Sequence, residues 1–120
     1  MNGIIFLNKK EIINFVKLSR TEQSIQIGES LKKSLVKCNG TYYQYNTDKA
    51  LWCELDNDNM MAFMATYLQS TTNNIKKIFK SDIPESIQKL FTLFDGTKYI
   101  NDIITRMNLT LEDNTFHTKL

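Results

Sequence analysis

The sequence has few of the residues that metal sites and loop-rich chains depend on. It contains one histidine, His117, and two cysteines, Cys38 and Cys53, among 120 residues with only four glycines and one proline. A closed zinc site needs four ligands, so the Cys and His residues of one chain cannot supply one, and we expect no metal site. The cysteines could form one disulfide, but free thiols in an intracellular protein are the simpler interpretation.

Long apolar runs are also missing. The apolar N-terminal run, residues 4–7, ends at Asn8-Lys9-Lys10, and it is far shorter than a signal segment or the roughly 20 residues of a membrane-spanning helix. We therefore expect an intracellular protein without membrane contact.

Motifs for phosphate loops, dinucleotide binding, nucleophile elbows and zinc hydrolases do not occur in the sequence. Nothing in these residues indicates a catalytic site, and we expect this segment to be no enzyme and to bind no cofactor. The net charge of +2 arises from 15 basic and 13 acidic side chains, so overall charge alone does not indicate nucleic-acid binding.

The composition, 42% hydrophobic and 23% charged, is typical of one ordered domain. We predict an α+β fold that is mainly α-helical, with about five or six helices and one antiparallel β-hairpin near residues 41–55. Apolar spacing predicts a first helix over residues 9–19 and a second that Thr21 caps and that runs to about Val36, with Ile27, Leu31 and Leu35 on one face.

The hairpin follows the turn pair Asn39-Gly40 and has aromatic strands at residues 41–45 and 50–55. Strand alternation places Tyr43 with Tyr45 on one face and Tyr42 on the other, so at least one set should be buried.

Three amphipathic segments follow the hairpin. The first begins near Met60; we predict a break at residues 70–74, which favour caps and turns, and a restart at residues 75–79. The second enters at Pro84 after a cap by Ser81 or Asp82 and stops at residues 95–96. The third opens at Thr97 and ends at Asn108.

Clusters of lysine and aromatic residues are the candidate functional positions. Ammonium groups on converging faces would bind phosphates without sequence selectivity, and rings on a hairpin could stack on bases. The residues that we predict to contact DNA are Lys32, Lys33, Lys76, Lys77 and Lys80, with Tyr42 or Trp52 as stacking rings.

A known family shares part of this pattern. The matching residues are the run Cys38-Asn39-Gly40-Thr41-Tyr42-Tyr43-Gln44-Tyr45, then Ala50-Leu51-Trp52, then a capped helix. This order resembles the N-terminal domain of poxvirus-type superfamily 3 helicases, and residues 112–120 resemble the stretch that precedes the family's ATPase module.

The resemblance implies an accessory domain of a replicative helicase, often fused to a primase, from a large DNA virus, phage or mobile element. Such a domain helps to assemble a ring, commonly hexameric, and contacts DNA weakly, while a downstream module binds ATP and magnesium. Residues 1–37 would then be an N-terminal helix pair packed on the same domain, 38–109 the hairpin and helical core, and 110–120 a linker toward that module. The expected location is the host cytoplasm or a viral replication site.

Two other functions remain open. The near-neutral charge is also compatible with a protein-binding adaptor that contacts no nucleic acid. Residues 84–107 have the outline of a helix-turn-helix regulator, although a generic helical hairpin is the simpler interpretation. The polar residues of its candidate recognition helix are Lys98, Asn101, Asp102, Thr105 and Arg106.

Overall fold

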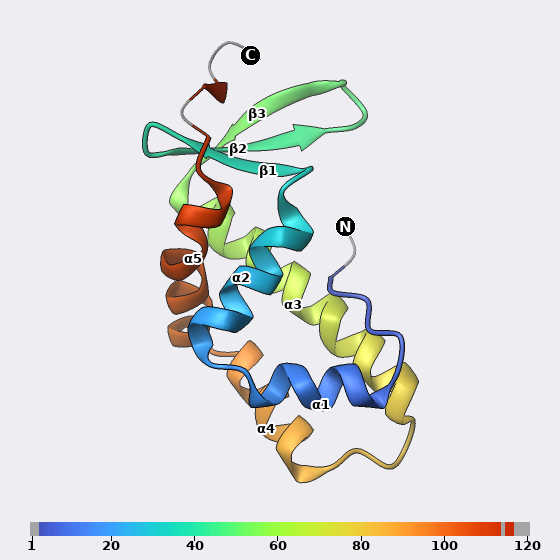
Figure 1. Ribbon diagram of the computed structural model, residues 1–120. Coiled ribbons are helices and arrows are strands. Elements are labelled where there is room, and N and C mark those ends of the chain that lie inside the picture. The colour runs from blue at the N-terminus through green and yellow to red at the C-terminus, as the bar shows by residue number, and fades with distance from the viewer. Residues whose placement is uncertain (1–2, 114, 117–120) are drawn as a thin grey trace.

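The computed structural model describes residues 3–113 and 115–116. In this part of the chain five helices surround one core and a three-stranded sheet lies at one end. The elements are α1 (Lys9–Lys17), α2 (Arg20–Leu31), β1 (Leu35–Cys38), β2 (Thr41–Asn46), β3 (Leu51–Leu55), α3 (Asn57–Phe79), α4 (Glu85–Phe94) and α5 (Thr97–Leu111). Figure 1 shows α3 running from the sheet to the opposite end, where α1 and α4 lie.

This architecture confirms the predicted α+β, mainly helical fold. None of the described helices combines the length and the hydropathy that crossing a bilayer requires.

The second helix is shorter than the sequence predicted. It starts with a capping box, in which Ser19 accepts from the Glu22 amide and the Glu22 side chain accepts from the Ser19 amide. The cap is therefore Ser19, and Thr21 lies inside α2. The helix ends at Leu31, because the chain turns there to place Leu35 and Val36 in β1. The predicted extension to Val36 was wrong, as was the assignment of residues 35–37 to a helix pair.

The sheet has three strands rather than two. It has the order β1-β2-β3, and both neighbouring pairs are antiparallel. The β1–β2 loop consists of Asn39 and Gly40, whose φ angles of 50° and 82° fit the two-residue turn whose twist matches paired strands. The two predicted strands are confirmed as β2 and β3, which pair Tyr45 with Trp52, although β2 extends to Asn46 and Ala50 belongs to the turn before β3.

Helix α3 continues without a break through residues 70–74, contrary to the prediction. The hydroxyl groups there bond in ways compatible with a helix: Thr71 Oγ1 donates to the Tyr67 carbonyl and accepts from the Ile4 amide at 3.0 Å. Ser70 accepts from the Gly3 amide, and the Asn74 side chain donates to the Ile4 carbonyl. The residues expected to break the helix therefore attach the N-terminal segment to it.

The N-terminal cap of α4 and the C-terminal end of α5 differ from the prediction. Pro84 is the N-cap of α4 without a side-chain hydrogen bond, so neither Ser81 nor Asp82 caps it. The turn at residues 95–96 and the start of α5 at Thr97 are confirmed. Helix α5 continues past Asn108 to Leu111, since Leu111 is buried in the same core as Met107.

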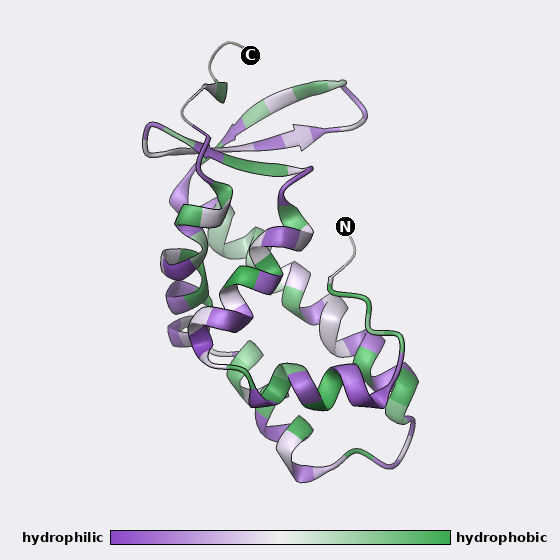
Figure 2. Cartoon of the chain, in the orientation of Figure 1, coloured by the Kyte–Doolittle hydropathy of each residue, from purple (hydrophilic) through white to green (hydrophobic). Residues whose placement is uncertain are grey.

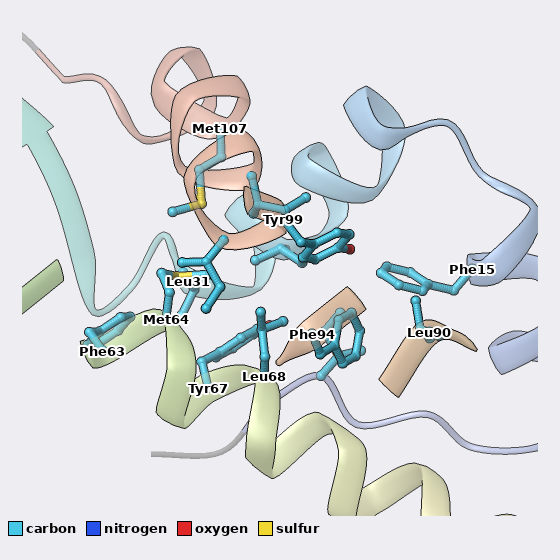
Figure 3. Packing of buried hydrophobic residues seen from close by; sticks show 14 of the residues in the cluster. Phe15, Leu31, Phe63, Met64, Tyr67, Leu68, Leu90, Phe94, Tyr99 and Met107 are labelled. Atoms are coloured by element: carbon cyan, nitrogen blue, oxygen red, sulfur yellow. The ribbon is translucent and has the colours of Figure 1, made fainter. Parts of the chain in front are cut away.

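The core joins α1 and α2 to the three later helices. Figure 3 shows rings and aliphatic chains from α1, α2, α3, α4 and α5 directed at one interior, and Figure 2 shows α5 hydrophobic toward that interior and hydrophilic outside. Two buried contacts fix the approach of α2. Gln23 donates to the Phe15 carbonyl and accepts from the Tyr99 hydroxyl at 2.8 Å. A Cβ on Gly28 would lie 2.9 Å from the Thr110 side chain of α5, so only a glycine fits without displacement.

The C-terminal segment lies against the sheet. Residues 110 and 111 belong to α5, Glu112 forms a parallel bridge with Lys37, and the Asp113 amide donates to the Lys37 carbonyl at 2.9 Å. Phe116 is 2% exposed and packs on Val36 and Cys38. Residues 114 and 117–120 of the predicted linker lie outside the described residues.

Candidate nucleic-acid interface

The lysines predicted to contact DNA lie in two separate places. Lys32 and Lys33 follow the end of α2 and precede β1, next to the sheet. Lys76 and Lys77 lie in the last turn of α3, and Lys80 is its C-cap, at the opposite end of that helix (Figure 1). Helix α3 has 23 residues, which at 1.5 Å per residue is about 35 Å. The structure therefore does not form one stripe from both sets, because a long helix separates them.

A different pair of lysines joins the second set. The first turn of α1, with Lys9 and Lys10, lies beside the end of α3 in Figure 1, and the Lys9 Nζ atom is 5.5 Å from the centre of the Phe79 ring. On the α4 side, the Lys76 Nζ atom is 5.6 Å from the centre of the Phe91 ring. We call this group the lysine corner; it consists of Lys9, Lys10, Lys76, Lys77 and Lys80.

All five side chains of the lysine corner belong to exposed residues. Among the described residues none of them forms a salt bridge; the lysines that do are Lys32, with Glu29, and Lys89, with Glu85. The nearby Glu11 carboxylate accepts instead from the Leu7 amide. The corner therefore combines five positive charges, none of which is held in a salt bridge within the described part of the chain.

Three of these lysines occupy positions where a lysine lowers the stability of the fold. Lys9 and Lys10 occupy the first turn of α1, although the positive end of the helix dipole favours acidic side chains there. Lys80 has a φ of 59° and a ψ of −125°, a conformation that glycine adopts freely and other residues rarely. Lys76 and Lys77, in the last turn of α3, are by contrast favoured by its dipole.

The aromatic residues of the sheet divide between its two faces, as alternation predicted. Tyr42 faces the helices, is 7% exposed and hydrogen-bonds with the side-chain amide of Asn108. The Lys37 Nζ atom lies 5.2 Å from the centre of its ring, and burial raises the pKa of the Tyr42 phenol. A base cannot stack on a ring enclosed in this way, so the predicted stacking role of Tyr42 is not supported.

Trp52 lies on the outer face of the sheet, but a side chain from the C-terminal segment already packs on it. The centre of the Phe116 ring is 4.8 Å from that of Trp52 and 5.3 Å from that of Tyr43, and the centre of the Tyr45 ring is 5.3 Å from that of Trp52. These contacts leave Trp52 half-buried. The sequence offered one signal for this arrangement, an isolated apolar Phe116 in a polar tail.

The polar side of α5 is not free to enter a DNA groove as a recognition helix. Asp102 bonds to Arg106 at 2.8 Å and to Arg20 of α2 at 3.2 Å, and Arg106 also donates to Thr21. The Arg20 guanidinium lies 4.5 Å from the centre of the Tyr99 ring. The hydrogen bond from Arg106 is the main cause that holds the pKa of Asp102 below its usual range. This network joins α5 to α2 and disfavours the helix-turn-helix interpretation.

Metal-binding groups are equally scarce in three dimensions. Within residues 3–113 and 115–116, no three His, Cys, Asp or Glu side chains gather where a metal ion could bind. Cys38 and Cys53 are both free thiols. They lie on opposite faces of the sheet, since Cys38 packs with Phe116 and Cys53 pairs with Gln44 on the helix side.

Comparison of the chain with protein-family models, with curated proteins and with solved structures found no match.

Proposed function

We propose that this chain is a non-catalytic accessory domain that binds DNA weakly and without sequence selectivity through the lysine corner. The observation that carries the proposal is the gathering of five lysines at the shared end of α1 and α3, none of which forms a salt bridge with a described carboxylate. Ammonium groups that neutralise phosphates release counterions, and this release supplies most of non-specific DNA affinity.

The positions of these lysines support a binding role over a purely structural one. Charges at the start of α1 cost about 0.3–1 kcal/mol each, and a non-glycine residue in a sparsely populated backbone region costs about 1–3 kcal/mol. Lys9, Lys10 and Lys80 thus oppose local stability. Local conflicts of this kind concentrate at functional sites.

The biological setting that we propose follows from the sequence resemblance. It is a viral-type superfamily 3 replicative helicase, within which this domain would assist ring assembly inside the cell. ATP and magnesium would bind to a downstream module, and no residue described here is assigned a part in their chemistry.

Charge reversal tests the proposal. The double variant Lys76→Glu, Lys77→Glu should bind a labelled duplex at least tenfold more weakly in fluorescence anisotropy, because it replaces attraction by repulsion at two positions. The matched control is Lys32→Glu, Lys33→Glu, which changes the charge equally at the sheet end and should bind nearly as well as the unchanged chain. An equal loss of duplex affinity in both variants would show that only the net charge of the chain matters. The lysine corner would then not be the DNA-binding site.

A protein-binding adaptor is the second candidate, and one observation favours it. The outer face of the sheet already holds an aromatic side chain, Phe116, between Tyr43 and Trp52. A chain that shows no DNA binding even at low salt would leave this face as the functional surface.

A further inference from the structure

We propose that the lysine corner binds the phosphate backbone of double-stranded DNA in preference to single strands, and that no base stacks on this domain. This inference rests on the proposed function and specifies its ligand. It follows from the positions of the aromatic rings, the type of cation and the charge density of the two DNA forms.

The rings at the lysine corner are buried or half-buried, and each already has a lysine ammonium group over it. Phe79 is 5% exposed and has the Lys9 ammonium above it, and Phe91 is half-buried beside Lys76. Proteins that prefer single strands combine a basic groove with rings on which successive bases stack. The corner supplies the charges alone.

The rings of the outer sheet face cannot supply the missing stacking surface. They lie at the opposite end of α3 (Figure 1), and Phe116 occupies the space between Tyr43 and Trp52. Glu54, the cross-strand partner of Tyr43, adds a negative charge to the same face, which repels phosphate. A strand bound at the corner therefore gains nothing from these rings.

The cations of the corner are all lysines, and this residue type favours contacts with phosphates over contacts with base edges. Lysine acts as a compact point charge, whereas the planar fork of arginine suits bidentate contacts with a guanine edge. Point charges respond to the density of phosphates, which is one per about 1.7 Å in a duplex and one per about 3.4 Å in each of its strands. Duplex DNA should therefore bind more tightly, with equal affinity for different sequences.

The salt dependence of the DNA affinity can be predicted from the number of lysines in the corner. If all five ammonium groups contact phosphates, the logarithm of the association constant should fall with the logarithm of salt concentration with a slope of about −4.5 on a duplex and about −3.5 on a single strand. Each lysine that makes no contact reduces the duplex slope by about 0.9.

The experiment uses the full chain and two readouts in one titration. Anisotropy is measured for a labelled duplex, a duplex of scrambled sequence and the separated strands across a salt series, while the emission of Trp52, the single tryptophan, reports stacking. We expect both duplexes to bind equally, at least threefold more tightly than either strand, with unchanged Trp52 emission. In the variant Lys76→Gln, Lys77→Gln the duplex slope should be less steep, its magnitude reduced by about 1.8.

The possible failures are distinguishable. Tighter binding to single strands, or quenching of Trp52 when DNA binds, would overturn this inference and leave the proposed function standing. A preference for one duplex sequence would overturn this inference, since lysine point charges read no base, and it would also contradict the lack of sequence selectivity in the proposed function. No binding to any of the oligonucleotides would overturn both proposals.

Discussion

Replacing Lys80 by glycine should make the domain more stable and weaken its binding to DNA at the same time. The φ of 59° and ψ of −125° at Lys80 lie in a region that costs a residue with a side chain about 1–3 kcal/mol. Glycine removes this cost but adds about 0.5–1 kcal/mol of conformational entropy to the unfolded chain. The net gain in the free energy of unfolding should be about 1 kcal/mol.

The same substitution removes one ammonium group from the lysine corner. The loss of one phosphate contact should reduce the salt slope by about 0.9 and the affinity by roughly eightfold at 0.1 M salt. Urea unfolding followed by circular dichroism measures the gain in the free energy of unfolding. Anisotropy with a duplex measures the loss of DNA affinity. A gain of about 1 kcal/mol corresponds to a rise of about 3–5 °C in Tm for a domain of this size.

Two control variants separate charge from backbone strain. Lys80→Gln removes the charge without relieving the backbone, so it should lose DNA affinity like Lys80→Gly without the gain in stability. Gly40 has a φ of 82° and open space where a Cβ would stand, so Gly40→Ala should lose about 1 kcal/mol from backbone strain alone. A Lys80→Gly variant that is no more stable would refute the strain argument, and one with unchanged DNA affinity would remove Lys80 from the site.

Three further changes test the packing and its electrostatics. Gly28→Ala places a Cβ 2.9 Å from the Thr110 side chain; overpacking of about 1–3 kcal/mol should exceed the roughly 1 kcal/mol gained in helix propensity, and urea titration should show a net loss that Thr110→Ala reduces. Phe116→Ala removes the ring that packs on Trp52, so we expect a loss of about 3 kcal/mol and a red-shifted Trp52 emission; an unshifted emission would show that the ring is not seated there. Arg106 lowers the pKa of Asp102 in the folded chain. The ionised carboxylate should therefore stabilise the fold above a pH of about 4, the pKa of Asp in the unfolded chain. This stabilisation should be lost as the pH falls through the lower pKa of the folded state. Acid unfolding of Asp102→Asn should lack that part of the pH dependence.

The sequence predicted the amphipathic helices well and the helix–strand boundary at residue 31 poorly. Leu35 continues the four-residue spacing of Ile27 and Leu31, so periodicity alone assigns it to the helix. The stronger local signal was the pair Asn39-Gly40 with apolar residues on both sides, which is typical of a two-residue hairpin loop. That signal requires a strand before the turn as well as after it, and β1 is that strand.

The false break at residues 70–74 has a physical cause that local propensity does not contain. Ser, Thr and Asn disfavour helix interiors because their side chains compete for backbone groups. Here Ser70, Thr71 and Asn74 find partners in residues 3 and 4, nearly seventy positions away in the sequence. Tertiary hydrogen bonds thereby override the local preference.

The candidate site was only half visible in the sequence. Lys76, Lys77 and Lys80 are close in sequence and on one helix end, so their clustering could be predicted. Lys9 and Lys10 join them only because α1 packs beside the end of α3, and Lys32 and Lys33 are excluded because α3 is continuous. Both facts depend on the arrangement of helices in space rather than on local pattern.

Chemical-shift mapping of the isotopically labelled chain during titration with duplex DNA would show whether the lysine corner is the DNA-binding site, because it locates the contact without any substitution. We expect backbone amide shifts to change at residues 9–11 and 76–80, and these changes should disappear at high salt. Changes concentrated in residues 41–55, with none at the lysine corner, would contradict this expectation.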